Sequence, residues 1–309
     1  MAEGSSLTRR AALASVAVAI ILLVLKIWAS WKTGSVAMLG SLADTGLDLL
    51  ASLVTLFAVR VASEPADAEH RFGHGKAEAI AALVQTVLIA LSALAIGIRA
   101  ITSFAQPGSV ARPDLGIGVS LVAIALTLVL VIYQRSVIAR TGSIAISSDN
   151  LHYQSDLALN VAVIVAFVID GLAGIAGADA VFGLLIAAWL GYSAFGTGNR
   201  AVDMLMDREW PELRRQQLLN MVAEMPDVHG VHALKTRKSG THDFAQFKIW
   251  LDPKLSVAAA HDIVERVEAA VRQRFPDTEV IVHVDPRGHF DETDLEEKDL
   301  WEAESPSAT

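Results

Sequence analysis

Residues 36–59 read VAMLGSLADTGLDLLASLVTLFAV, an almost wholly apolar run that is long enough to cross a bilayer and yet holds two acids. Asp44 and Asp48 stand four residues apart, which places both carboxylates on one face of a helix. A charge at the bilayer centre costs about 2.5–3.5 kcal/mol on insertion scales, so two carboxylates on one face need partners. The run therefore predicts a membrane-spanning helix with a functional polar face.

A second apolar run, residues 144–169, holds His152 and Asp156 at the same spacing. Together with Asp44 and Asp48 they supply four ligands, enough for the tetrahedral arrangement that zinc favours. One imidazole among three carboxylates accepts Zn²⁺, Cd²⁺, Fe²⁺ or Co²⁺ and disfavours Mg²⁺ and Ca²⁺. Two such helices predict a divalent-metal site inside a membrane, which is typical of transport. The alternative is that these residues are helix-end or mutually bonded structural polar groups.

The composition supports a membrane protein. The chain is 53% hydrophobic and 19% charged over 309 residues, which is too apolar for an ordinary soluble domain. Its formal charge of −9 argues against nucleic acid as a partner. Because the chain has no cysteine, disulfides are excluded and any metal must be held by histidine and carboxylate.

Runs of about 20 apolar residues predict six spans, near residues 11–33, 36–60, 78–105, 115–138, 144–170 and 178–200. Lys26, in the first of them, is expected to snorkel toward the far interface. The basic residues beside the spans predict that both termini are cytoplasmic, and we expect a multi-pass protein of the inner (plasma) membrane. The predicted domains are a cytoplasmic N-terminal segment (1–10) and a six-span transport domain (11–208). They are followed by a cytoplasmic regulatory and dimerisation domain (209–290) and an acidic disordered tail (291–309).

After the spans the pattern changes to that of a small α+β module. Pro211 suits the first turn of a helix running to about residue 224. Residues 231–237 and 244–251 alternate like strands, residues 257–275 carry a helical apolar stripe, and residues 279–284 form a third strand. The order α-β-β-α-β predicts an open-faced sandwich with both helices on one face of the sheet.

Two further groups of possible ligands lie outside the spans. Asp67, His70 and His74 follow the second span at helical spacing and form a shallow metal site if the segment is locally helical. The alternative is a solvated, charged loop. Most of the 9 histidines follow residue 225, and this density favours metal binding in the module.

Several enzyme classes lack support. The chain has no His-Glu-x-x-His, no glycine-rich phosphate loop and no convincing nucleophile triad, so we expect no enzyme. Ser147 and Ser148 near His152 are a weak basis for an intramembrane hydrolase. A membrane-anchored metal sensor is the other rival, in which the spans only anchor the histidine-rich module.

Five motifs are specific: LADTGLD at 42–48, PAD at 65–67, FGHGKAE at 72–78, LHYQSD at 151–156 and VHVDP at 282–286. On these motifs the chain, from roughly residue 8 to residue 290, resembles a cation diffusion facilitator of the bacterial zinc/iron efflux type. The resemblance implies a homodimer with six spans per protomer and a metallochaperone-like, ferredoxin-like cytoplasmic domain. It also implies export of metal against inward-moving protons.

The resemblance also assigns residues. It implies a transport site at Asp44, Asp48, His152 and Asp156 and a loop site at Asp67, His70 and His74. It also implies a cytoplasmic site at His232, His261, His283 and Asp285, and a salt bridge within the membrane dimer between Lys76 and Asp207. The family's bridging histidine of the cytoplasmic site corresponds to Lys248, and a neighbouring polar ligand to Val284. A cation where a shared ligand belongs puts a two-metal cytoplasmic site in doubt.

The expected function is that of a divalent metal/proton antiporter that exports Zn²⁺, and also Cd²⁺ and Fe²⁺, from the cytoplasm. A proton on His152 competes directly with the metal, because binding needs a neutral imidazole. The expected partners are a second copy of the chain, membrane lipid, metal ions and protons. The alternative within transporters is export of Fe²⁺ or Mn²⁺.

Overall fold

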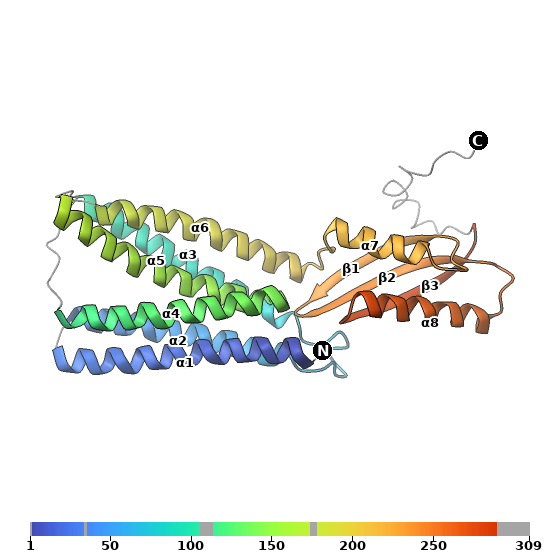
Figure 1. Cartoon of the computed structure of the whole chain (residues 1–309), viewed down its shortest axis with the longest axis horizontal. Helices are drawn as coiled ribbons and strands as arrows, with labels where there is room; N and C mark the ends of the chain where they lie inside the picture. Colours follow the sequence, from blue (N-terminus) through green and yellow to red (C-terminus); the bar gives the residue numbers. More distant parts are fainter. Residues whose placement is uncertain (1, 34–35, 106–113, 174–177, 289–309) are drawn as a thin grey trace. The chain divides into compact units, whose positions relative to one another are not determined.

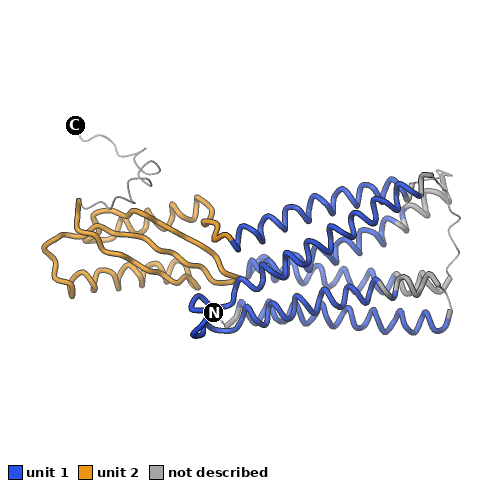
Figure 2. Tube along the Cα trace, turned by 180° about the vertical axis from the view of Figure 1, so that it is seen from behind, with its two compact units in different colours: residues 1–205 blue, residues 206–309 orange. Residues whose placement is uncertain are grey.

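The computed structural model describes residues 2–33, 36–105, 114–173 and 178–288. The chain divides into unit 1, residues 1–205, and unit 2, residues 206–309, which meet three residues before the boundary predicted after residue 208 (Figure 2). The predicted acidic tail, residues 291–309, lies outside the described residues. Each unit has its own buried core and is described by itself.

Unit 1 is a bundle of long helices that contain all six predicted spans (Figure 1). They are α1 (Ala2–Thr33), α2 (Val36–Ala62), α3 (Ala77–Ala105), α4 (Asp114–Thr141), α5 (Ile144–Ala173) and α6 (Ala178–Leu205). Over the described residues, α1, α2, α3, α4 and α6 are long and apolar enough to cross a membrane. Residues 2–10, predicted as a separate segment, form the first turns of α1, where Leu7 packs against a buried cluster and the Thr8 hydroxyl donates to backbone carbonyls of the preceding turn.

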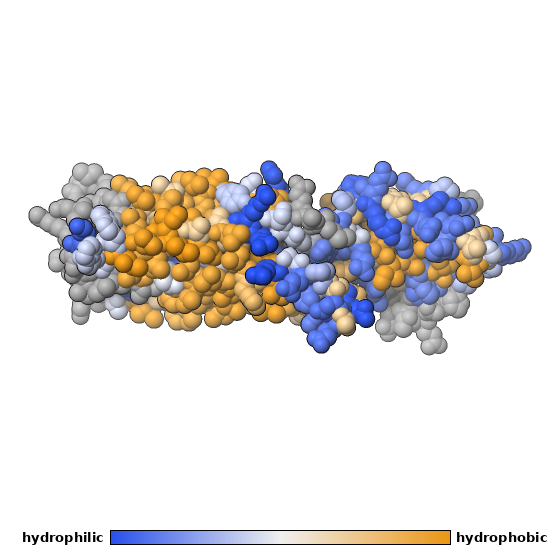
Figure 3. Space-filling model, turned by 90° about the horizontal axis from the view of Figure 1, so that it is seen from below, coloured by the Kyte–Doolittle hydropathy of each residue, from blue (hydrophilic) through white to orange (hydrophobic). Residues whose placement is uncertain are grey.

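The outer surface of unit 1 is apolar while part of its interior is polar. Figure 3 shows a broad hydrophobic surface over the helices on the face drawn. Phe57, Leu91 and Phe195 are 69%, 58% and 69% exposed, whereas Gln85 and Gln134 are fully buried. An apolar exterior with polar groups facing inward is the arrangement that a lipid environment requires.

Helices α3 and α6 pack closely through small residues. A Cβ atom added to Gly183 would lie 3.0 Å from Cβ of Ala100, and one added to Gly198 would lie 3.1 Å from Cγ2 of Thr86. The residue number rises along α6 as it falls along α3 in these two contacts, so the two helices are antiparallel. Close approach through glycine and alanine is how membrane helices gain packing without a hydrophobic driving force.

Unit 2 confirms the predicted α+β order. It comprises α7 (Glu212–Ala223), β1 (Val231–Ser239), β2 (His242–Leu251), α8 (Val257–Arg274) and β3 (Thr278–Pro286). The sheet order is β1-β2-β3, with β1 antiparallel and β3 parallel to β2. The parallel pairing of β2 with β3 follows from α8, which provides the crossover that such a pair needs.

One core joins both helices of unit 2 to a single face of the sheet. Val222 of α7, Val267 of α8 and Phe247 of β2 belong to the same buried cluster. Because side chains alternate along a strand, Lys248 and its neighbours in register, His232 and His283, lie on the opposite face. The sandwich is therefore open, as predicted, and its helix-free face carries the polar residues.

Candidate metal centre

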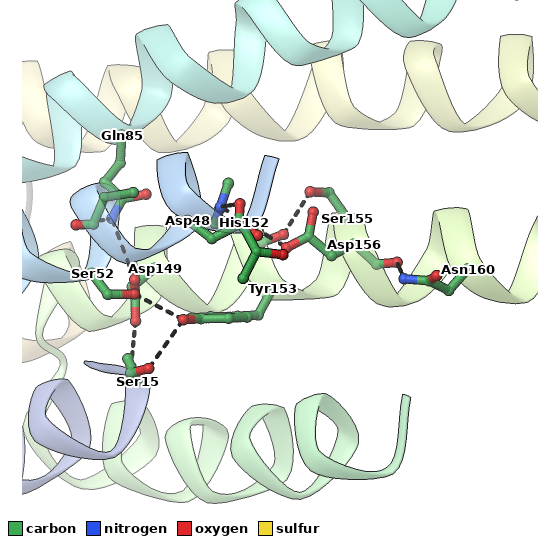
Figure 4. Close-up of polar contacts among 12 residues, drawn as sticks. Ser15, Asp48, Ser52, Gln85, Asp149, His152, Tyr153, Ser155, Asp156 and Asn160 are labelled. Carbon is green, nitrogen blue, oxygen red and sulfur yellow. Dashed lines mark hydrogen bonds and ion pairs between the residues drawn. The ribbon is translucent and has the colours of Figure 1, made fainter. Parts of the chain in front are cut away.

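Three of the four predicted intramembrane ligands come together between α2 and α5. Nε2 of His152 lies 2.9 Å from Oδ1 of Asp48 and 3.9 Å from Oδ2 of Asp156 (Figure 4). Ligand atoms of these three residues all lie within 4.8 Å of one another. The i, i+4 spacing puts His152 and Asp156 on one face of α5, and α2 supplies the third group from the facing helix.

The donor set fits a divalent cation. His152 is buried, and its Nδ1 atom has no hydrogen-bond partner among the described residues. A buried nitrogen without a partner and two carboxylates converging on the other nitrogen are unusual unless a ligand completes the group. One nitrogen and several oxygens at this separation can hold Zn²⁺ or a similar ion in a site with an open position.

Asp44 stands apart from the group of three. It lies one turn before Asp48 on α2 and is exposed, so it is not among the ligand atoms within 4.8 Å of one another. It is nevertheless close enough to act electrostatically on Asp156, as is Lys26 of α1. Within the single chain, Asp44 therefore borders the group, and its role as a fourth ligand stays a prediction.

Lys26 does not snorkel as predicted. Its Nζ atom donates a hydrogen bond of 2.6 Å to Oγ1 of Thr45, a fully buried residue of α2. The reason is geometric, because α1 packs along α2 and brings a hydroxyl acceptor within hydrogen-bond reach of the ammonium. The lysine is thereby directed at the helix that carries Asp44 and Asp48.

A buried carboxylate that we did not predict as a site residue lies one turn before His152. Asp149 is fully buried and accepts hydrogen bonds from Ser15 at 2.6 Å, Gln134 at 2.7 Å and Gln85 at 3.3 Å. These donors come from α1, α4 and α3 respectively. Asp149 therefore ties three helices to α5 (Figure 4). The run of polar residues from 147 to 150 was the only signal in the sequence.

Tyr153 adds a second connection beside the metal group. Its hydroxyl lies 2.8 Å from Oγ of Ser52 on α2 and donates to the carbonyl of Ser15 on α1 at 3.2 Å. Its ring is 2% exposed and meets the His152 ring edge-on. These contacts fix the rotation of α5, which decides where His152 points.

The predicted loop group also assembles. Oδ1 and Oδ2 of Asp67 lie 3.4 Å from His70 Nδ1 and from His74 Nε2 respectively, and the three form a possible metal group. The segment is not helical, contrary to the condition under which we expected the site. Asp67 instead closes a turn by accepting the backbone N–H groups of His70 and Glu69, at 2.6 and 2.8 Å.

The same turn affects the charge of Asp67. The backbone N–H of His70 is the largest influence that lowers the pKa of the Asp67 carboxyl below its ordinary value of 3.8. Hydrogen bonds to the charged form stabilise it, so Asp67 is ionised throughout the neutral range. The loop therefore presents a fixed anion beside two imidazoles.

In unit 2 the open face of the sheet collects three of the four predicted ligands around a lysine. Oδ2 of Asp285 lies 3.1 Å from Nε2 of His232 and 3.7 Å from Nζ of Lys248, and Oδ1 lies 3.1 Å from Nε2 of His283. The fourth predicted ligand, His261 on α8, is exposed and lies 3.4 Å from Glu265. The role of all four as metal ligands stays a prediction.

The two residues of the predicted dimer salt bridge have contacts within their own units. Lys76 donates to the carbonyl of Leu205 at 3.2 Å, and Asp207 lies 3.6 Å from Arg237. A pairing of Lys76 with Asp207 remains the prediction that the resemblance made.

A helical bundle with an apolar exterior and a group of one buried histidine and two half-buried carboxylates defines a multi-pass membrane protein that handles a metal cation. Residues 12–206 match the family model described as the cation efflux transmembrane domain, and residues 210–287 match that of the cation efflux protein cytoplasmic domain. The chain belongs to the cation diffusion facilitator family of cation efflux proteins. It is therefore a divalent-metal exporter and not an enzyme.

Two relatives that are similar over most of the chain agree with this assignment. Proteins named cation-efflux pump FieF, from Yersinia pestis (strain Pestoides F) and from Yersinia pseudotuberculosis (strain IP32953), are each 45% identical over 278 residues, which cover 90% of this chain and 92% of theirs. A solved structure of the metal-bound C-terminal domain of the CzcD transporter from Thermotoga maritima is 33% identical. It covers 26% of this chain and 95% of its own, with a TM-score of 0.25.

Proposed function

We propose that this protein is a divalent metal/proton antiporter that exports Zn²⁺ from the cytoplasm and also carries Cd²⁺ and Fe²⁺. The observation that carries the proposal is the convergence of Asp48, His152 and Asp156 from two membrane helices, with ligand atoms within 4.8 Å. We assign Asp44 to the same site as a fourth ligand, supplied when α2 shifts against α5. The metal is the transported substrate.

The choice of Zn²⁺ rests on the donor set. An imidazole with carboxylates is softer than an all-oxygen site and harder than a thiolate site, which suits borderline ions. Oxygen donors still predominate, and this favours Fe²⁺ or Mn²⁺ export as the second candidate. The relatives' name, cation-efflux pump, fits either choice.

Proton coupling follows from the chemistry of the ligands. The site binds metal only when its imidazole is neutral and its carboxylates are ionised, so protons and metal compete for the same atoms. A site that opens to the cytoplasm loads metal, and one that opens to a proton-rich exterior releases it. A bundle that rocks around a fixed site within the membrane would provide this alternation.

We further propose a homodimer in the inner membrane with both termini in the cytoplasm. The match of unit 2 to the family's cytoplasmic domain supports the dimer, and the distribution of basic residues supports the orientation. The loop group of Asp67, His70 and His74 would then stand at the cytoplasmic ends of α2 and α3. There it could bind metal outside the translocation path.

The test is metal flux into sealed proteoliposomes with Asp48→Ala. We expect the variant to fold and dimerise but to lose Zn²⁺ flux, because the site loses the carboxylate nearest to His152. Glu64→Ala, which removes an exposed acid just after α2, is the matched control and should transport normally. Full flux by folded Asp48→Ala protein would refute the transport site and favour a membrane-anchored sensor. Metal-dependent hydrolysis without flux would favour the hydrolase.

A further inference from the structure

Lys26 places an ammonium group within a membrane helix. The residue lies in the last third of the apolar part of α1, seven residues before the helix ends at Thr33, and an ammonium within a membrane helix is costly. It is half-buried and donates to Thr45 across the α1–α2 interface at 2.6 Å. An ammonium group that is kept within a membrane span and directed toward a neighbouring helix indicates a function.

The acceptor of that hydrogen bond lies among the metal ligands of α2. Thr45 is 1% exposed, follows Asp44 directly and precedes Asp48 by three residues, which is less than one helical turn. Lys26 also acts electrostatically on Asp156 of α5. The ammonium thus stands at the border of a site that gathers carboxylates from two helices.

We propose that Lys26 is a built-in counter-cation of the transport site, which weakens metal binding so that the cargo can be released. The inference rests on the proposed function of that site. Several carboxylates around one imidazole would hold a divalent ion tightly in a low-dielectric interior. A transported ion must bind well enough to enter and weakly enough to leave, and a fixed positive charge nearby shifts that balance toward release.

The same charge also stabilises the site when no metal is present. Carboxylates left facing one another between α2 and α5 repel, and repulsion would separate the helices that must close again. The ammonium, held by Thr45, offsets part of this repulsion without blocking His152. Lys26 is therefore a positioning and affinity-setting residue and does not itself bind the metal.

The experiment is Zn²⁺ titration of the purified full-length protein, with transport kinetics in proteoliposomes. At an effective dielectric constant of about 20, a unit charge as far as about 10 Å from a divalent ion is worth more than a decade of affinity, so we expect Lys26→Gln to bind Zn²⁺ at least about tenfold more tightly. Its turnover should fall because release slows, while KM also falls. Lys26→Arg, which keeps the charge, should retain wild-type values.

Two further variants separate charge from packing. Lys32→Gln removes a lysine from the exposed last turn of α1 and should leave affinity unchanged. Thr45→Val keeps the shape of the side chain but removes the acceptor of the Lys26 hydrogen bond, and it should tighten binding by a smaller factor than Lys26→Gln. If Lys26→Gln fails to fold, Thr45→Val carries the test. Wild-type affinity in every folded variant at Lys26 or Thr45 would overturn the proposal.

The Asp48→Ala background distinguishes this proposal from the proposed function. If Lys26 acts on the transport site, Lys26→Gln should leave Zn²⁺ affinity unchanged once Asp48 is absent. A tightening that persists in that background would overturn the role of Lys26. Transport by Asp48→Ala alone would instead overturn the site itself. Loss of transport in Asp48→Ala with no effect of Lys26→Gln in the wild type would overturn only the counter-cation.

Discussion

His152 is the one nitrogen donor in a group otherwise made of carboxylates, so it should govern the choice of metal. Replacing it with aspartate makes the site all-oxygen, and harder sites favour harder ions. We expect His152→Asp to shift the preference from Zn²⁺ toward Mn²⁺ in competition assays of transport. The control is His229→Asp, at an exposed histidine of unit 2. An unchanged ranking of metals would count against His152 as a ligand.

Asp149 should be a stability residue more than a ligand. Asparagine in its place would turn an acceptor of three hydrogen bonds into a group that also donates, leaving at least one buried donor unpaired. We expect Asp149→Asn to lower the free energy of unfolding by about 1–3 kcal/mol. Thermal unfolding in detergent measures it, with Glu64→Gln as an exposed control. A melting temperature equal to that of the wild type would show that the network contributes little.

Single residues were predictable where they broke a pattern. Asp48, His152 and Asp156 stand out because each interrupts an apolar run. The free-energy cost of an ionisable group within a membrane span indicates that it has a function. Lys26 also interrupts a run, but its partner could not be foreseen, because Thr45 is reached only when α1 packs on α2. Asp149 was missed for a similar reason, since its donors lie on three other helices.

At the scale of elements, the loop between α2 and α3 makes a prediction about pH. The pKa of Asp67 is lowered, so its carboxylate supports the turn above pH 3.8 and loses that role only as the pH falls through the lowered value. Between pH 5 and 8 the charge of this carboxylate is therefore constant. We expect Zn²⁺ binding by the loop to weaken as the pH falls, because protons compete with the metal for the imidazole nitrogens of His70 and His74.

Metal titrations at several pH values in the Asp48→Ala background isolate the loop from the transport site. Asp67→Asn should weaken Zn²⁺ binding at every pH without moving the pH at which binding is half lost. If half of the binding were lost near pH 4, the carboxylate, and not the histidines, would limit binding.

The open face of the unit 2 sheet makes a second prediction. Lys248 stands between His232 and His283 in register and lies 3.7 Å from the carboxylate that both histidines approach. Its ammonium repels a metal ion, so we expect fewer than two tight Zn²⁺ sites per chain. Titration calorimetry on residues 206–290 measures this. Lys248→His should raise affinity or stoichiometry, whereas Lys254→His, at an exposed loop, should not. Two tight sites in the wild type would refute it.

Elements were more predictable than their junctions. The α-β-β-α-β order followed from alternation and helical stripes, and the strands extend only a few residues beyond the predicted ranges. The start of α1 at Ala2 was missed, because the hydrophobic pattern of a span says nothing of polar turns that continue the helix. The loop site assembled by a turn at Asp67 and not by the helix that its spacing suggested.

For the whole molecule, proton competition at the transport site predicts that a pH gradient drives export. An inward proton gradient should accelerate Zn²⁺ export from sealed vesicles, and metal movement should cause measurable counterflow of protons. Each ligand proton displaced on binding contributes up to a decade of affinity per pH unit. His152→Ala should lose most of this dependence if it still binds metal. Export that ignores an imposed gradient would indicate a uniporter.

The helices of unit 1 are longer than the hydrocarbon core of a bilayer is thick. They run from 27 residues in α2 to 32 in α1, which corresponds to about 40–48 Å, whereas a hydrocarbon core spans about 30 Å. The excess must be met by tilting or by turns that project into the headgroups. Each change of tilt alters how much apolar side chain touches acyl chains. For the rocking bundle proposed above, the thickness of the surrounding lipid would enter the free-energy difference between the inward-open and outward-open states, so we expect acyl-chain length to change the transport rate.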